Sequence, residues 1–305
     1  MPPPLRHLHL PSRSPTLFPP YRLASRLQNH LRRLQLDFKD SPSTSPPPPP
    51  ALLTFTPPPT YTLGRRQHPS DLNINIPRLL APLSLPSGIP LPPVSVLAAP
   101  RGGLATYHGP GQIVLWPVVD LRSPVHLHFT VRCWARALED TSVAVLRGLG
   151  VEGLVVEGEN PGVWVRDDAR GGGGMRKIAA LGVHLRRHVS GLGMAVNVDM
   201  PGTEEEEGGV GEEGNPWRRF VACGVEGRGV TSVRGEGGRV VPGEVVARRW
   251  AGELAGRIGV EGVEAVGREE VVGVLEGVLE GDGGEEGPVG EEERGYVAAL
   301  RAGEV

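Results

Sequence analysis

Cysteine is scarce in this chain of 305 residues, which contains only Cys133 and Cys223. Two thiols cannot build a disulfide framework or a cysteine-rich zinc cluster, so we expect a reducing compartment and no metal site. Long apolar runs are also missing. No stretch approaches the roughly 20 apolar residues of a membrane-spanning helix, and we expect a soluble protein without membrane contact. Aromatic residues make up only 5% of the chain and the net charge is -3, which does not favour nucleic-acid binding.

Lysine is almost absent from the basic residues. The 32 Lys and Arg residues include only Lys39 and Lys177, so arginine supplies nearly every cation. A retained ammonium group indicates a chemical need, because a desolvated amine can lose its proton whereas a guanidinium group cannot. A lysine near a cysteine also favours the nucleophilic thiolate. The stretch from Met175 to Cys223 therefore leads to the hypothesis that Lys177 and Cys223 form a catalytic dyad. The alternative for Lys177 is a structural cation.

Glycine and proline are abundant, with 44 and 32 residues, and they divide the chain by composition. Residues 1–20 are predicted to be disordered or part of a transit segment. The first 36 residues contain arginine but no Asp or Glu, which is typical of organelle targeting and indicates a mitochondrial protein. A disordered terminus without a targeting role is the alternative. Residues 21–233 are predicted to form one domain with disordered insertions near 41–50, 167–174 and 202–214. Residues 234–305 are predicted to hold a helix and a low-complexity tail, irregular beyond residue 259.

Hydrophobic periodicity predicts a mixture of helices and strands. Leu23, Leu27, Leu31 and Leu34 recur at helical spacing, which predicts an amphipathic helix over 21–37. A continuous apolar run over 113–119 predicts a strand buried on both faces, with Pro117 placing its far end at an edge or bulge. Three further helices are predicted: a short one near 79, one over 128–149 that buries Cys133, and one over 246–258. The further predicted strands lie over 51–56 and 94–96, in a hairpin over 154–156 and 163–165, and in a strand pair over 177–186 and 194–199 that turns at 190–191.

A glycine-rich segment, RGGLATYHGPGQ, runs from Arg101 to Gln112. Its glycines flank a short strand and allow backbone N–H groups to come close to a ligand. A glycine-rich hairpin without a ligand is the alternative, and the spacing alone favours neither.

Four blocks of sequence together resemble the lipoyl(octanoyl) transferase family. They are TYTLGR at 60–65, the segment 101–112, the set PGVWV at 161–165, KIAALG at 177–182 and AVNVD at 195–199, and finally VACGV at 221–225 with GVTS at 229–232. The blocks follow the family's order across most of 21–233. The resemblance implies an α/β fold with a mixed β-sheet flanked by helices, like the catalytic fold of biotin and lipoate protein ligases.

By this resemblance, the domain transfers octanoyl groups from octanoyl-acyl carrier protein to a lysine amine of lipoyl domains, in protein lipoylation. Cys223 is implied to be the acyl-thioester nucleophile and Lys177 the residue that lowers its pKa. The implied acceptors are the lipoyl domains of 2-oxoacid dehydrogenase complexes and the glycine cleavage H protein, with no ATP or other cofactor. The implied substrate pocket consists of Arg101, Gly102, Gly103, Leu104, Ala105, Thr106, Tyr107, His108, Ala180, Leu181, Gly182, Gly193, Met194 and Ala195.

The chain also departs from the family, and three other interpretations stay open. Ala222 stands where the family usually has a proline before the cysteine, which loosens the turn. The alternatives are an ATP-dependent lipoate or biotin-type ligase of the same fold, a non-catalytic homologue that binds lipoyl domains, and an RNA-binding protein of the RGG type. The few aromatics and the negative charge disfavour the last of these. The N-terminal composition suits a mitochondrial member of the fungal type.

Overall fold

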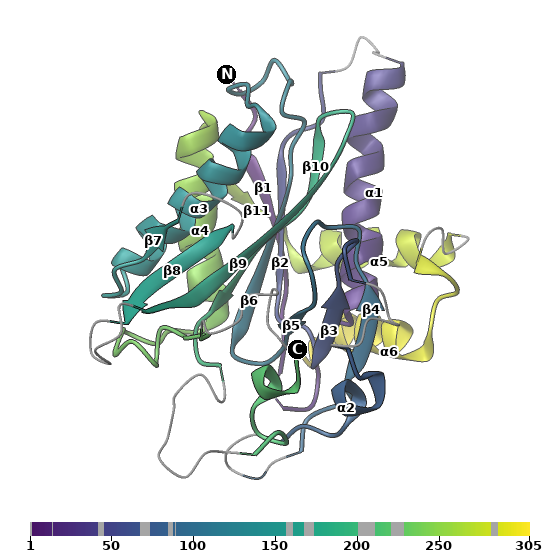
Figure 1. The fold of residues 1–305 in the computed structure, drawn as a ribbon. Helices are drawn as coiled ribbons and strands as arrows, with labels where there is room; N and C mark the ends of the chain where they lie inside the picture. Colours follow the sequence, from purple (N-terminus) through teal and green to yellow (C-terminus); the bar gives the residue numbers. More distant parts are fainter. Residues whose placement is uncertain are drawn as a thin grey trace.

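A mixed β-sheet forms the centre of the computed structural model, which describes residues 2–13, 15–41, 46–67, 74–84, 88, 90–156, 161–167, 174–200, 211–220, 229–281 and 286–305 (Figure 1). Its strands are β1 (Leu5–Leu10), β2 (Ala51–Phe55), β6 (Gln112–Val118), β7 (Leu154–Val155), β8 (Gly162–Asp167), β9 (Gly174–Arg186), β10 (Val189–Asn197) and β11 (Val263–Ala265). Within the described residues their order is β11-β1-β2-β6-β10-β9-β8-β7. β1 runs parallel to β2 and β11, and the other neighbours are antiparallel.

Helices cover both faces of this sheet. α3 (Val131–Arg147) and α4 (Gly243–Ile258) lie on one face, and α1 (Tyr21–Asp40), α5 (Arg268–Glu280) and α6 (Glu291–Ala302) lie on the other (Figure 1). The predicted fold class, a mixed sheet flanked by helices, is confirmed. None of the helices that can be described is both long and apolar enough to cross a membrane.

A smaller sheet lies beside the main one. Its strands β3 (Thr60–Leu63), β4 (Ser95–Ala98) and β5 (Thr106–His108) follow the order β4-β3-β5, and the short helix α2 (Ile76–Leu80) and a 3₁₀ helix (Pro216–Arg219) pack nearby. The predicted short helix and strand correspond to α2 and β4. The predicted hairpin near residue 160 is formed by β7 and β8.

β6 is buried on both faces, as its apolar run predicts. Val114 and Trp116 pack in the core beneath α1, whereas Ile113 and Leu115 pack in the core beneath α3 and α4. This alternation follows from the two-residue period of a strand, and both sets of side chains have a helix layer to cover them. Pro117 lies two residues beyond Leu115, the last β6 residue that pairs with β10, but it still pairs with Leu52 of β2, so it is not at the edge or bulge that was predicted.

The N-terminal residues are folded, which corrects the prediction that 1–20 are disordered. In β1 the leucines Leu5, Leu8 and Leu10 are at most 2% exposed, and the strand lies between β2 and β11. The prolines and arginines dominate the local composition, but the short segment LRHLHL still has the apolar content of a strand with neighbours on both sides. A transit role for this segment, and the predicted domain boundaries, remain predictions.

The C-terminal residues also form regular structure, so the expected irregular tail beyond residue 259 is wrong. β11, α5 and α6 follow one another there, and Val271, Leu275 and Leu279 recur at helical spacing on the buried face of α5. They pack with Tyr296 and Leu300 of α6 in the same core as α1. Abundant Gly and Glu conceal this stripe because they occupy the exposed positions of the helices.

Two local predictions need correction. The β9–β10 hairpin turns at Arg187 and His188, which both have positive φ values of 50° and 70°, and not at residues 190–191. A two-residue turn with two left-handed residues matches the twist of a hairpin and lengthens both strands. Cys133 is exposed rather than buried, because it lies in the first turn of α3, where Thr130 caps the helix and Trp134 takes the buried position.

The predicted insertions over 41–50, 167–174 and 202–214 lie partly outside the described residues. Among the parts that can be described, Gln35 donates to the carbonyls of Pro48 and Pro49, and Asp167 pairs with Gly174 at the end of the β8–β9 ladder, while the predicted disorder of the insertions stays a prediction.

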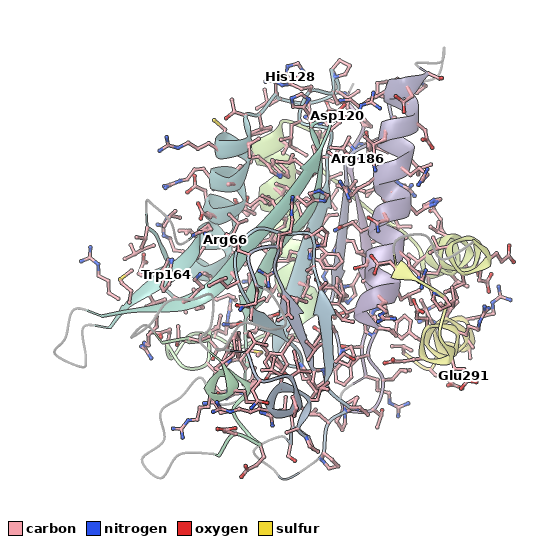
Figure 2. The ribbon with its side chains drawn as sticks, turned by 45° about the vertical axis from the view of Figure 1, so that its right-hand side comes forward. Arg66, Asp120, His128, Trp164, Arg186 and Glu291 are labelled. Atoms are coloured by element: carbon pink, nitrogen blue, oxygen red, sulfur yellow. The ribbon has the colours of Figure 1, made fainter. Side chains whose placement is uncertain are left out.

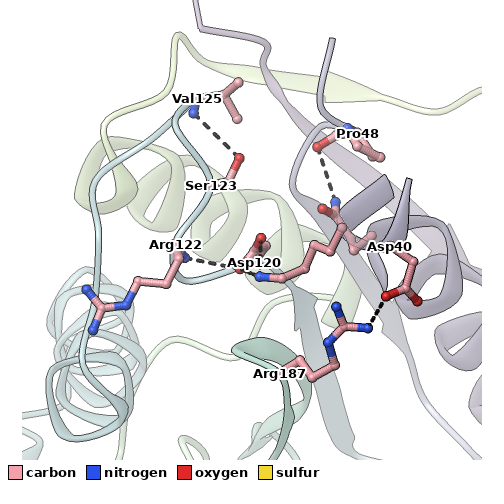
Figure 3. A network of polar contacts seen from close by, with 9 residues as sticks. Asp40, Pro48, Asp120, Arg122, Ser123, Val125 and Arg187 are labelled. Atoms are coloured by element: carbon pink, nitrogen blue, oxygen red, sulfur yellow. Dashed lines mark hydrogen bonds and ion pairs between the residues drawn. The ribbon is translucent and has the colours of Figure 1, made fainter. Parts of the chain in front are cut away.

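A polar network anchors the end of α1 to the rest of the domain (Figure 3). Lys39 Nζ donates to both carboxylate oxygens of Asp120 at 2.8 Å, and Asp120 also accepts from the backbone N–H of Arg122. Asp40 forms an ion pair with Arg187 at the β9–β10 turn. The network therefore ties α1 to the loop after β6 and to the hairpin, and it gives Lys39 a structural role as a cation.

Candidate functional site

A small pocket lies between α1, the main sheet and the β3–β5 sheet. Its volume is about 40 Å³. It is lined by Tyr21, Arg101, Thr106, His108, Trp116, Ala180, Leu181, Gly182, Leu192, Gly193, Met194 and Ala195. Nine of the fourteen residues predicted for the substrate pocket are in this lining, so segments that are 70 or more residues apart in sequence meet at one place. That they bind substrate remains a prediction.

The five other predicted residues shape the loop rather than the pocket wall. The Tyr107 ring packs away from the pocket, 5.1 Å from the ring of Tyr61 and 5.6 Å from that of Trp217. Gly102, Gly103, Leu104 and Ala105 form the bend before β5. Gly103 has a φ of 83°, which favours glycine, and its carbonyl lies where a Cβ on Gly64 would be only 2.4 Å away.

Arg101 is buried and holds its own loop in shape. One guanidinium nitrogen donates to the carbonyl of Leu104 at 2.7 Å, and the other donates to the carbonyl and hydroxyl oxygens of Thr62 at 2.7 and 2.9 Å. The side chain crosses over Gly182 of β9, where a Cβ would lie 2.7 Å from Arg101 Cδ. A glycine at position 182 is therefore required for the loop to close over the sheet.

His108 forms the inner wall of the pocket and is neutral at physiological pH. Its Nδ1 donates to Gln112 Oε1 at 2.7 Å, and its ring stacks on Tyr21 at 5.6 Å. Burial lowers the pKa of His108 from 6.5 to about 4; the Arg101 charge adds to this and the Gln112 hydrogen bond opposes it. A histidine in this state donates through one nitrogen and accepts through the other, without carrying charge.

A chain of buried polar contacts connects His108 with the strand that carries Lys177. Gln112 Nε2 donates to Asn197 Oδ1 at 2.9 Å, and Asn197 Nδ2 donates to the carbonyl of Thr231 at 2.9 Å. The backbone N–H of Thr231 then donates to the carbonyl of Lys177 at 3.0 Å. Because these buried groups find partners in one another, they fix the position of the Lys177 strand relative to the pocket.

Lys177 is 8% exposed and lies at the edge where β9 meets β8 and residues 229–231. Its Nζ donates to the carbonyl of Pro161 at 3.2 Å and stands 4.6 Å from the centre of the ring of Trp164. Figure 2 labels Trp164 at this end of the sheet. The backbone N–H of Lys177 donates to the carbonyl of Gly229 at 2.9 Å. A carbonyl and an aromatic face are both groups that a lysine ammonium contacts favourably.

A β-bulge turns Lys177 toward the pocket face of the sheet. In the β8–β9 register, Val163 pairs with Ala179 but Trp164 pairs with Lys177, so Ile178 has no partner across the ladder. Val163 and Ala179 pack beneath α3 and α4, and Trp164 therefore faces the opposite side, with Lys177 beside it. In a regular strand Lys177 would share the direction of Ala179. Bulges re-aim side chains in this way near active sites.

Cys223 lies outside the described residues, so the distance between its thiol and Lys177 stays a prediction. In sequence it stands between two described positions, Phe220 and Gly229. The other thiol, Cys133, is on the surface of α3, in the helix layer that covers the face of the sheet away from the pocket.

Three pocket residues were missed by the sequence analysis. Tyr21 begins the predicted helix, and Trp116 lies in the predicted buried strand, but neither pattern shows which side chains meet at a cavity. Leu192 has a φ of 60° inside β10, an unusual conformation for a non-glycine residue. Among the described residues, no group of three or more His, Cys, Asp or Glu side chains is placed to hold a metal ion.

Comparison with known proteins identifies the family. Residues 36–255 match the family described as the lipoyl protein ligase A/B catalytic domain. The chain is 31% identical over 217 residues to the "Probable octanoyltransferase" of Schizosaccharomyces pombe, covering 71% of this chain and 81% of the relative. It is 33% identical over 211 residues to an octanoyltransferase of Chloroflexus aggregans, covering 68% of this chain and 80% of the relative.

Two solved structures share the fold at low sequence identity. One is a bi-partite lipoate protein ligase from Thermoplasma acidophilum, with a TM-score of 0.54 at 14% identity, covering 90% of this chain and 91% of that chain. The other is LipL1 of P. falciparum in complex with lipoate, with a TM-score of 0.56 at 11% identity, covering 98% of this chain and 72% of that chain. Since the family match spans most of the chain and the sequence relatives exceed 30% identity, the chain belongs to the lipoyl(octanoyl) transferase family and is an acyltransferase.

Proposed function

We propose that this enzyme moves an octanoyl group from octanoyl-acyl carrier protein to a lysine amine of a lipoyl domain, with Cys223 as the acyl carrier and Lys177 as its cationic partner. The relatives are octanoyltransferases, which supports octanoyl as the group that this enzyme transfers. One observation carries the assignment of Lys177. A buried ammonium group is turned by a bulge toward the pocket face, on a strand that pairs directly with residues 229–231, soon after Cys223 in sequence.

The proposed reaction has two transfers. The Cys223 thiolate attacks the carbonyl of the carrier thioester, the new C–S bond forms, and the carrier leaves as its thiol after taking up a proton. The lysine amine of the lipoyl domain then attacks the enzyme thioester, an amide bond forms, and the cysteine sulfur is released. The first exchange is nearly balanced in energy and the second is downhill, so no ATP is needed. Covalent transfer of this kind predicts ping-pong kinetics.

Lys177 contributes charge and proton transfer rather than most of the rate. A free thiol has a pKa of about 8.5, so full ionisation at neutral pH gains little more than one order of magnitude, or about 1.4–2 kcal/mol. The ammonium has three N–H donors. In the part of the chain that the structure describes, its acceptor is the Pro161 carbonyl, which leaves donors for the thiolate. Most of the rate is expected from positioning and from backbone N–H donors to the developing oxyanion, since loss of one such donor costs about 2.7–4 kcal/mol.

The acyl-enzyme tests this proposal directly. Incubation with octanoyl-acyl carrier protein should add one octanoyl group to the protein, and peptide mass spectrometry should place it on Cys223. Cys223→Ser should abolish the thioester, whereas Cys133→Ser, which changes the exposed thiol on α3, should retain it. Full transfer by Cys223→Ser would overturn the mechanism.

The Lys177→Arg variant tests whether Lys177 acts through its positive charge or through proton transfer. This variant keeps a cation but loses an amine that can accept a proton, so acyl transfer should fall while the protein remains folded. Undiminished transfer would reduce Lys177 to a structural cation like Lys39, whose role is its ion pair with Asp120. The same reactions run with and without ATP distinguish an ATP-dependent ligase, which would require the nucleotide.

The proposed acceptors are lipoyl domains of 2-oxoacid dehydrogenase complexes and the glycine cleavage H protein, and the proposed location is the mitochondrion. The acid-free, arginine-containing N-terminus supports the location. Because β1 is part of the sheet, processing that removed residues 1–20 would also remove a core strand. Microscopy of a fluorescent C-terminal fusion, with sequencing of the mature N-terminus, tests both points. Diffuse cytosolic fluorescence would overturn the location.

A further inference from the structure

Tyr21 lines the pocket together with His108 and Trp116. The residue begins α1, before the segment 36–255 that matches the family, and its side chain is only 6% exposed. Its ring stacks on His108 at 5.6 Å and meets the ring of Trp116 edge-on at 5.2 Å. The wall is therefore an aromatic ring supplied by a helix and backed by side chains from the sheets.

The sheet geometry separates Lys177, which lies outside the lining of the pocket, from Tyr21. Lys177 is on β9, whereas the Trp116 that supports Tyr21 is on β6, with β10 between them. Two strand spacings give about 10 Å across the sheet. Trp116 also lies level with Gly193 of β10 and Gly182 of β9. Gly182 is about 13 Å further along β9 than Lys177. An acyl chain whose carbonyl lies between Lys177 and the pocket would cross residues 180–182 with its tail directed toward Tyr21.

The space before Tyr21 is limited. A volume of about 40 Å³ holds about three water molecules, so an eight-carbon tail has to push the lining aside. The lining strands cannot move far, because they belong to the central sheet. Tyr21 belongs to α1 and not to the sheet, and its ring stands between the pocket and the core beneath α1. The position of this ring therefore sets how far an acyl tail can extend.

The Tyr21 hydroxyl has no hydrogen-bond partner among the described residues, although the ring is buried. Burial raises the pKa of Tyr21, so the group stays a neutral phenol. Because the hydroxyl makes no hydrogen bond of its own with the described residues, it is the bulk of the ring that ends the pocket, and Tyr21→Phe keeps that bulk.

We propose that Tyr21 limits the length of the acyl chain that the enzyme accepts. This inference rests on the proposed function, since it takes the pocket to be the acyl site. Replacing Tyr21 by alanine should open space toward the α1 core and favour tails longer than octanoyl. Each additional buried methylene is worth about fourfold in affinity, so decanoyl should gain roughly 15-fold relative to octanoyl.

The test measures chain-length ratios in two ways. Competing hexanoyl-, octanoyl-, decanoyl- and dodecanoyl-acyl carrier proteins report transfer to Cys223, and calorimetry of the free fatty acids with the Cys223→Ser protein reports binding without any transfer. The variants are Tyr21→Ala, Tyr21→Leu in case the alanine variant fails to fold, and Tyr21→Phe. Leu27→Ala is the matched control, because Leu27 is buried on the same helix but does not line the pocket.

The proposal predicts a shift toward decanoyl in Tyr21→Ala or Tyr21→Leu in both measurements, with Tyr21→Phe and Leu27→Ala close to wild type. Unchanged ratios in the folded Tyr21 variants, or an equal shift in Leu27→Ala, would overturn it. If wild-type protein forms no acyl-enzyme but binding shows the chain-length shift, the transfer mechanism fails and the role of Tyr21 stands. Absence of both transfer and fatty-acid binding would overturn both.

Discussion

Acidification should destabilise the protein through His108, and replacing this residue should remove a defined part of the effect. The ring is buried, and its hydrogen bond to Gln112 does not offset the cost of burying a charge, so the folded-state pKa is about 4 against 6.5 for an unperturbed histidine. Between these two values the unfolded chain binds a proton that the folded chain does not. Stability contributed by the neutral ring is therefore complete above about pH 6.5 and is lost as the pH falls towards 4.

The two pKa values fix the expected size of the effect. Lowering the pH from about 7 to about 4.5 protonates most unfolded chains at His108 but only a minority of folded ones. The resulting loss in the free energy of unfolding is about 2 kcal/mol from this residue alone. Burial also lowers the pKa of His7 to about 4, so a second loss of similar size should persist when His108 is replaced.

Urea unfolding of wild type and His108→Gln at several pH values measures this contribution. Glutamine keeps a polar side chain near Gln112 but cannot titrate. We expect the two proteins to lose stability in parallel between pH 8.5 and 7, whatever their absolute difference. Below about pH 6.5 the wild type should lose about 2 kcal/mol more than the variant. Equal losses down to pH 4.5 would show that His108 is not held neutral by its surroundings, and the reasoning on its environment would be wrong.

Three further predictions concern the framework of the site. Asn197→Ala removes the side-chain partner of Gln112 Nε2 and of the Thr231 carbonyl and should lower the free energy of unfolding by about 2–4 kcal/mol in urea, together with acyl transfer; a stable variant with normal transfer would contradict the positioning role. Leu8→Ala should cost about 2–5 kcal/mol if β1 is part of the core, and a neutral effect would argue against that strand. Glu293→Gln should cost about 3–5 kcal/mol because it removes the carboxylate charge beside the buried Arg26 guanidinium, whereas Glu270→Gln, at an exposed ion pair, should cost at most about 1 kcal/mol in the same assay.

The elements that could be predicted are those whose signal is local. The helical spacing of Leu23 and Leu27 and the apolar run of β6 require no knowledge of distant neighbours, because each element has to bury its own stripe or faces. The family blocks add long-range information that periodicity lacks. They brought together Arg101, His108 and Gly182, which the structure places around one pocket.

The errors fall where a segment depends on partners far away in the sequence. β1 is a strand because β2 and β11 pair with it, and its short apolar pattern shows neither neighbour. α5 is stable because its valines and leucines pack on α1 and α6, while its own composition resembles a flexible tail. Tyr21 belongs to a correctly predicted helix, yet its place at the pocket depends on how α1 crosses β6.

The direction of Lys177 shows the same dependence at the scale of a single residue. Alternation along β9 assigns Lys177 to the face of Ala179, beneath α3 and α4, where a buried ammonium would meet an apolar core. Unpaired Ile178 reverses that direction and brings Lys177 beside Trp164. The sequence around position 177 gives no signal of a bulge, because the bulge depends on how β9 pairs with both β8 and residues 229–231. The scarcity of lysine singled out this residue, whose role stays a prediction, but only the register of two neighbouring segments turns it toward the pocket face.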